Sequence, residues 1–128
     1  MRIFILEDDF NRIEVFQKYL SDHELTIVSE ANEAIKILEK DCSFDLFYLD
    51  HDLGGLIYVD IGVENTGSTV AKYMSDKNIK GTIIIHSFNS VGAKNMLDYL
   101  PNAFYVPFNP EFIKRTNEWI LFKKEKKW

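Results

Sequence analysis

The chain has 128 residues, of which 46% are hydrophobic and 14% aromatic. These values predict one domain with a substantial core and exclude a disordered chain. The formal net charge of −5 argues against general nucleic-acid binding, because such binding relies on Lys and Arg side chains that neutralise phosphates.

Strands and helices alternate along the first part of the chain. Apolar and β-branched runs predict the strands, and apolar residues three or four apart predict the helices. Asp8 and Asp9 stand where the first helix begins, and Asn32 is the expected cap of the second, because short polar side chains favour this position. The predicted elements are a strand over residues 2–6, a helix over 10–20, a strand over 25–28 and a helix from Asn32 to about Lys40.

A mostly apolar run over residues 44–49 stops abruptly on Asp50, His51 and Asp52, and two glycines follow. This order predicts a buried central strand that delivers a polar cluster to one end of a sheet. In an extended backbone Asp50 and Asp52 face one way and His51 the other. The acidic residues 7–9 follow the first strand in the same manner, so the two strand ends predict one site.

Residues 54–66 are predicted to form a long loop or a small hairpin beside this site. The segment is either a surface excursion or a lid, because long loops in compact domains are disproportionately functional. The remaining predicted elements are a helix from about Ser68 to Lys77 capped by Asn65 or Thr66, a strand over 82–85, a helix capped by Asn89 or Ser90, a strand over 103–106 and one last helix opened by Asn109 and Pro110.

Strand and helix thus alternate five times. This pattern predicts an α/β fold with a doubly wound, five-stranded parallel sheet and helices on both faces, as one domain over residues 1–128. Ligands of such sheets bind at the carboxyl ends of the strands, beside a topological switch point. The strands over 2–6, 44–49 and 82–85 all end in polar residues on that edge.

Carboxylates that converge without thiolates form a hard-oxygen site, which suits Mg²⁺ or Mn²⁺ completed by water and a phosphate. The candidate ligands are Asp8, Asp9, Asp50 and Asp52. In the alternative interpretation these acids only cap helices, although clustered carboxylates without partners repel one another.

Two histidines stand at neighbouring strand ends. His86 is predicted to act as a general acid or to donate to a phosphoryl oxygen, with Ser87 and Asn89 adding hydrogen bonds. The alternative is a histidine satisfied by backbone groups at a strand end. His51 is either a second acid–base group or a metal ligand.

Cys42 is the only cysteine, so the sequence predicts neither an internal disulfide nor a thiolate zinc site. The apolar run over 3–6 is too short for a signal peptide, and no run reaches membrane-spanning length. We therefore expect a cytoplasmic protein with no membrane contact. Four lysines near the C-terminus are interpreted as a solvated helix end or a weak phosphate-contacting tail: Lys123, Lys124, Lys126 and Lys127.

Four short motifs resemble the landmarks of response-regulator receiver domains: ILEDD at 5–9, FYLD at 47–50, IIIHS at 83–87 and VPF at 106–108. The resemblance implies that Asp8 and Asp9 are the acid pair, Asp50 the phosphoacceptor and Ser87 the hydroxyl residue. Val106 replaces the lysine that precedes the final proline in that family. This departure argues against ordinary phosphoacceptor signalling, because the ammonium helps to stabilise the phosphoryl group.

Three further motifs resemble the receiver-like family called cyclic-phosphate processing receiver domains: LDHDLGG at 49–55, GSTVAKYM at 67–74 and HSFNSVGAKNM at 86–96. The positions that match its motifs are Asp50, His51, Asp52, His86, Ser87, Asn89 and Gly92.

The leading hypothesis is a metal-dependent phosphoesterase that acts on a cyclic phosphate or on a nucleotide or RNA-end phosphate. Its catalytic residues would be His86, His51 and Asp50, and its substrate contacts Ser87, Asn89 and Gly92. The alternative is a non-catalytic, atypical receiver module that switches a protein partner in trans.

Overall fold

Runs rich in Ile, Leu, Phe and Tyr form the strands of one parallel sheet, because such side chains pack well on a pleated surface. In the computed structural model, which describes residues 1–126 and side chains up to residue 123, the strand order is β2-β1-β3-β4-β5. The strands are β1 (Arg2–Leu6), β2 (Glu24–Val28), β3 (Leu46–Leu49), β4 (Thr82–Ile85) and β5 (Phe104–Tyr105). Of the basic tail, Lys127 lies outside the described residues.

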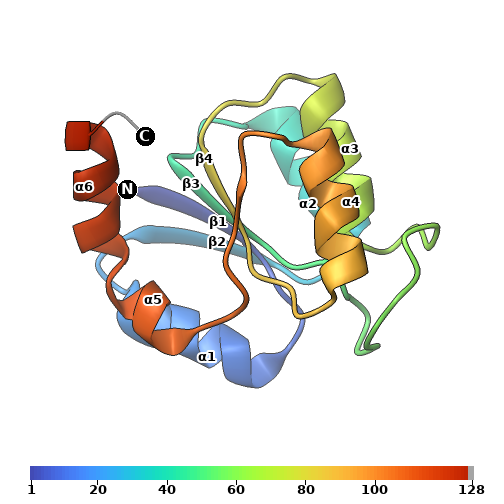
Figure 1. Cartoon of the computed structure of the whole chain (residues 1–128), viewed down its shortest axis with the longest axis horizontal. Helices are drawn as coiled ribbons and strands as arrows, with labels where there is room; N and C mark the ends of the chain where they lie inside the picture. The colour runs from blue at the N-terminus through green and yellow to red at the C-terminus, as the bar shows by residue number, and fades with distance from the viewer. Residues whose placement is uncertain (127–128) are drawn as a thin grey trace.

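Helices cover both faces of this sheet (Figure 1), which confirms the predicted doubly wound α/β fold. Three of them share one face: α2 (Ala31–Lys40), α3 (Gly67–Asp76) and α4 (Ser90–Tyr99). The other face carries α1 (Phe10–Tyr19), α5 (Pro110–Lys114) and α6 (Thr116–Lys126). Among the described residues, no helix combines the length and the apolar character needed to span a bilayer.

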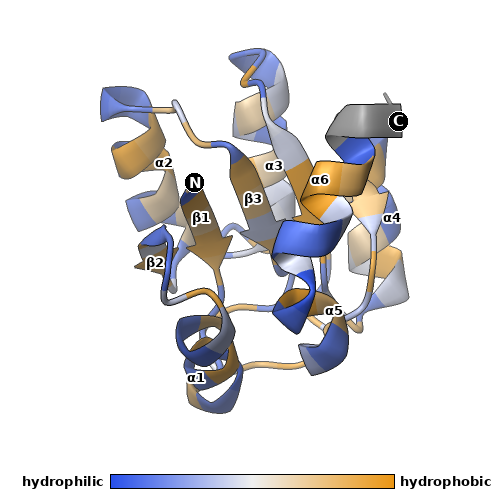
Figure 2. Cartoon of the chain, turned by 90° about the vertical axis from the view of Figure 1, so that its left-hand side faces the viewer, coloured by the Kyte–Doolittle hydropathy of each residue, from blue (hydrophilic) through white to orange (hydrophobic). Residues whose placement is uncertain are grey.

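The central strand β1 shows how the sheet divides the core. Phe4 and Leu6 pack toward α2, α3 and α4, whereas Ile3 and Ile5 pack toward α1 and α5, because successive side chains of a strand point to opposite faces. Figure 2 shows hydrophobic residues along β1 and β3, and both hydrophilic and hydrophobic residues along the helices. Burial of β1, β3 and β4 fixes their carboxyl ends side by side, and the polar residues that follow them are brought together.

The start of α2 differs from the prediction. The helix begins at Ala31 with Glu30 in the cap position, so Asn32 lies inside the first turn and does not cap it. The backbone N–H of Ala31 donates instead to Oδ1 of Asn65, at 2.9 Å. A side chain from the distant loop therefore satisfies this helix end, which local sequence could not indicate.

The predicted last helix is two helices, α5 and α6, with Arg115 between them. Thr116 explains the break. Its hydroxyl donates to the carbonyl oxygen of Ile113 at 2.6 Å and is also hydrogen-bonded to the hydroxyl of Tyr48 at 2.8 Å. A threonine hydroxyl that bonds to a carbonyl one turn back competes with the helical ladder and bends the helix.

The segment over 54–66 is a loop that contains no strand of its own. One isolated antiparallel bridge between Asp52 and Thr66 closes it. Thr66 occupies the cap position of α3 but makes no side-chain cap hydrogen bond, while Asn89 caps α4 as predicted by accepting from the N–H of Gly92. The loop therefore returns to the sheet edge directly beside Asp50.

Gly67, the first residue of α3, sets how closely that helix approaches the site. A Cβ at this position would overlap the backbone carbonyl oxygen of Asp50. We expect Gly67→Ala to lower the free energy of unfolding by about 1–3 kcal/mol, as overpacking of a rigid backbone contact does. Gly62→Ala is the matched control, because a Cβ there meets nothing within 4 Å. Urea unfolding measures both, and equal stabilities would contradict the close approach.

Candidate functional site

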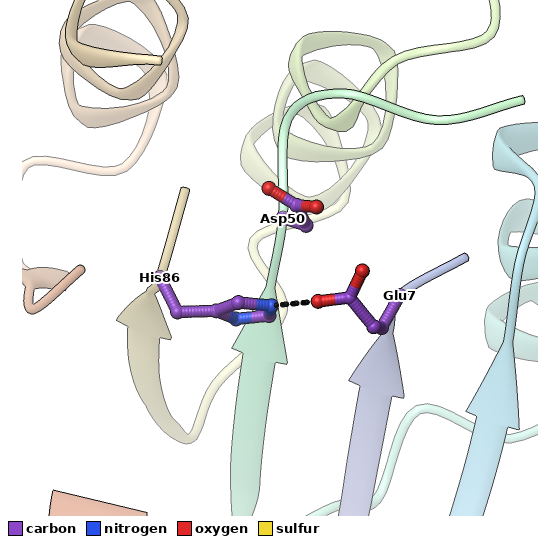
Figure 3. A group of neighbouring side chains, drawn as sticks. All are labelled: Glu7, Asp50 and His86. Atoms are coloured by element: carbon purple, nitrogen blue, oxygen red, sulfur yellow. Dashed lines mark hydrogen bonds and ion pairs between the residues drawn. The ribbon is translucent and has the colours of Figure 1, made fainter. Parts of the chain in front are cut away.

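Three buried ionisable side chains meet where β1, β3 and β4 end. Glu7 follows β1, Asp50 follows β3 and His86 follows β4, and one ligand atom from each lies within 4.8 Å of the others. Figure 3 shows the imidazole of His86 directed at the Glu7 carboxylate, with Asp50 beside the pair. Nε2 of His86 lies 2.9 Å from Oε1 of Glu7.

The electrostatic environment gives the carboxyl groups of Glu7 and Asp50 different pKa values. Burial would raise the pKa of Glu7, but its hydrogen bond and charge interaction with His86 and the backbone N–H of Asp9 hold that pKa below its ordinary value. Burial raises the pKa of Asp50 to about 6, an effect that His86 opposes and that the charge of Glu7 increases. Asp50 is therefore the member of the pair that binds a proton more readily.

Arg12 is the cation nearest to these acids among the described residues. Its Nη1 lies 3.7 Å from Oε1 of Glu7 and 3.7 Å from Oδ2 of Asp50. The rings of Phe88 and Phe108 flank its guanidinium, with ring centroids 4.7 and 5.1 Å from Cζ. The sequence analysis missed Arg12, because one arginine on a helix carries no motif.

An open cavity of about 290 Å³ lies above Asp50. Acidic side chains and Arg12 line its inner part, and the loop residues Leu56, Ile57 and Tyr58 with Phe88 form its rim. Asp50 and Asp52 both line it and His51 does not, as the alternation of an extended backbone predicts.

Asp8 and Asp9, the acid pair implied by the resemblance, both line the cavity. Asp9 caps α1, since its Oδ1 accepts from the N–H of Arg12 at 3.0 Å, and Glu7 rather than Asp9 groups with Asp50. Oδ2 of Asp8 accepts from the N–H of Gly55 at 2.6 Å on the cavity wall. Burial raises the pKa of Asp8 despite that hydrogen bond.

Asp52 holds the loop. Its carboxylate accepts from the N–H groups of Tyr58 at 2.6 Å and Val59 at 3.2 Å, and from Nδ2 of Asn89 at 3.0 Å. Nδ1 of His51 lies 3.0 Å from the same carboxylate. Although burial opposes it, these donors keep the pKa of Asp52 below its ordinary value. With its oxygens occupied, Asp52 is less available to a metal than the sequence predicts.

His51 lies behind the cavity wall and is completely buried. Its ring packs against Gly92, where a Cβ would overlap it. The structure therefore does not bring His51 or Gly92 into contact with a ligand in the cavity. Gly92 leaves room for the His51 ring, and that ring is hydrogen-bonded to the Asp52 carboxylate.

Ser87 and Asn89 do line the cavity, as predicted for substrate contacts. The amide of Asn89 is already occupied, because Nδ2 donates to Asp52 and to the carbonyl oxygen of Val59 while Oδ1 accepts from Gly92. The hydroxyl oxygen of Ser87 accepts from the N–H of Asn89 at 3.0 Å, which leaves its own proton for donation.

A family model described as cyclic-phosphate processing receiver domain matches residues 2–102. No curated protein sequence shows a significant match to the chain.

Several solved receiver domains share the fold at low identity. The signal receiver domain of a putative Luxo repressor from Vibrio parahaemolyticus has a TM-score of 0.68 and 18% identity, covering 98% of this chain and 93% of its own. The phosphorylated cyanobacterial phytochrome response regulator RcpA has a TM-score of 0.71 and 22% identity, and the match covers 94% of this chain and 93% of RcpA. Response regulator TrrA from Thermotoga maritima, in complex with Mg²⁺ and BeF, has a TM-score of 0.66 and 20% identity. The match covers 91% of this chain and 96% of TrrA.

The raised pKa of Asp50 predicts a pH-dependent stability. Between its ordinary pKa near 4 and its folded value of about 6, the folded chain binds more protons than the unfolded chain, so stability falls as pH rises through this window. Asp50→Asn keeps the acceptor for the N–H of His51 and removes the charge.

In the presence of a chelator, we expect Asp50→Asn to be more stable than the wild type by about 1–3 kcal/mol at pH 8 and not at pH 4, at roughly 1.4 kcal/mol per pKa unit. Urea unfolding at both pH values measures the difference. Asp98→Asn, at an exposed position on α4, is the control. A constant difference across pH would contradict the raised pKa.

Proposed function

Because the chain belongs to the family of cyclic-phosphate processing receiver domains, we propose that it is a metal-dependent phosphoesterase acting on a cyclic phosphate or on a nucleotide or RNA-end phosphate. The observation that carries this proposal is the grouping of Glu7, Asp50 and His86 beside an open cavity. Two carboxylates and one imidazole, without thiolates, suit Mg²⁺ or Mn²⁺.

Glu7 and Asp50 would hold the ion, with Asp8 on the adjacent wall of the cavity. When bound, such an ion neutralises phosphoryl charge and lowers the pKa of a coordinated water. The negative charge at this position also favours a divalent cation, since a cation relieves the repulsion between the two buried carboxylates.

We assign removal of the proton from the attacking water to the pair formed by Glu7 and His86. His86 does not line the cavity, whereas Glu7 does, so the imidazole reaches a ligand through the carboxylate 2.9 Å away. Glu7 would take a proton from the attacking water, while the N–H at Nε2 of His86 donates to this carboxylate and orients it. The oxygen released from phosphorus would take its proton from solvent. The hydroxyl of Ser87, which also lines the cavity, would donate to a phosphoryl oxygen.

This assignment predicts which variants lose activity. Glu7→Gln and Asp50→Asn should each lower hydrolysis by about a hundredfold or more, because each removes a proposed metal ligand and Glu7→Gln also removes the proposed base. His86→Gln should lower turnover and also weaken metal binding, because the ring orients Glu7. The assay is a screen of linear and cyclic nucleotides with Mg²⁺ and Mn²⁺, followed by steady-state kinetics and metal-binding calorimetry.

Glu14→Gln, at an exposed position on α1, should retain full activity. Wild-type activity in folded Glu7→Gln would exclude the proposed site, and no hydrolysis of any phosphate ester would favour the second candidate.

The second candidate is a non-catalytic receiver module that acts on a protein partner in trans. Its support is the receiver fold with Asp50 directly after β3, together with the likeness to a phosphorylated response regulator. Two observations weigh against it. Val106 replaces the expected lysine and packs against the core beside α1, and the buried Asp50 carboxylate has a raised pKa.

Labelling by a small phosphodonor separates the two candidates. We expect acetyl phosphate with Mg²⁺ to label the wild type poorly, because no lysine follows β5 to meet the new charge. Val106→Lys is the substitution expected to restore labelling most if the absence of the lysine is the cause. Mass spectrometry measures the incorporation, with Asp50→Asn as the blank. Stoichiometric and long-lived labelling of Asp50 would establish the switch instead.

A further inference from the structure

We infer that Arg12 is a phosphoryl-binding residue, which contacts a phosphate bound in the cavity from α1. The inference rests on the proposed function, because it assigns a ligand contact in the same cavity. Three observations carry it: the placement of Arg12 relative to the acids, the geometry of its ion pairs and the two aromatic rings that flank it.

Arg12 lines the cavity and its side chain is 23% exposed, so the guanidinium lies between the acids and solvent. At 3.7 Å, its contacts with Glu7 and Asp50 are longer than hydrogen bonds. The guanidinium therefore neutralises the acids while its N–H groups remain available. Its planar fork matches two oxygens of a phosphoryl group, which a lysine ammonium cannot do in the same way.

Phe88 and Phe108 keep the guanidinium at the cavity without fixing it to an acid. Both rings lie within the range in which an aromatic face attracts a cation. Phe88 is 54% exposed and stands on the cavity rim, whereas Phe108 packs against the core. A side chain held by ring faces can shift between the acids and a ligand at small cost.

The same position makes Arg12 a competitor of the metal. Glu7 and Asp50 are the carboxylates nearest to its guanidinium, and they are also the proposed ligands. A divalent cation between them would be repelled by Arg12 until a phosphoryl group lay between the two positive charges. Arg12 should therefore weaken the binding of metal alone and strengthen the binding of phosphate.

Calorimetry on the full chain tests whether Arg12 weakens the binding of metal and strengthens the binding of phosphate. With Arg12→Gln, we expect Mg²⁺ alone to bind several-fold more tightly. Inorganic phosphate, added at saturating Mg²⁺, should bind about tenfold to a hundredfold more weakly, as expected for the loss of a charged hydrogen bond. Arg12→Lys keeps the charge, so its Mg²⁺ affinity should match the wild type while its phosphate affinity falls between the two.

Arg115→Gln is the matched control, because Arg115 is an exposed arginine paired with Glu111 and Glu118 away from the cavity. It should change neither affinity. Unchanged phosphate binding in Arg12→Gln, or weaker Mg²⁺ binding, would overturn the inference. If Arg12→Gln does not fold, wild-type phosphate affinity in Arg12→Lys overturns the bidentate contact. Neither measurement requires turnover, so an inactive protein that shows both opposite shifts would overturn the phosphoesterase and retain the phosphoryl site.

Discussion

The burial of Glu7 next to Asp50 is the constraint on which the site depends. Two carboxylates removed from water at adjacent strand ends repel each other, and their desolvation is costly unless other groups compensate. His86 compensates from β4, and Arg12 compensates from α1. The parallel sheet makes this arrangement possible, because it places the ends of β1, β3 and β4 side by side and lets helices on both faces exclude water.

The acidic residues at this edge divide into two groups with different tasks. Glu7 and Asp50 group with His86, whereas Asp9 caps α1 and Asp52 holds the loop. Asp8 lies between the groups, since one of its oxygens accepts from Gly55 and its side chain still lines the cavity.

Sequence patterns were sufficient for the α/β fold and for the edge that carries the site, because hydrophobic periodicity and the polar residues after each strand are local features. The assignments that failed depend on contacts between distant residues. The choice of Glu7 over Asp9 follows from where His86 arrives, and the break at Thr116 involves Tyr48. The proximity of Arg12 to the site could not be predicted from the sequence, because it depends on the packing of α1 against β3 and β4.

The hydrogen bond from Ala31 to Asn65 links the loop to the first turn of α2. A displacement of the loop that withdraws Asn65 would leave the first turn of α2 without an acceptor, at a cost of about 0.5–2 kcal/mol. Displacement of the loop and fraying of α2 would thus be coupled through this hydrogen bond. Amide hydrogens in the first turn of α2 would report on displacement of the loop, although they lie on a helix that contributes no residue to the cavity lining.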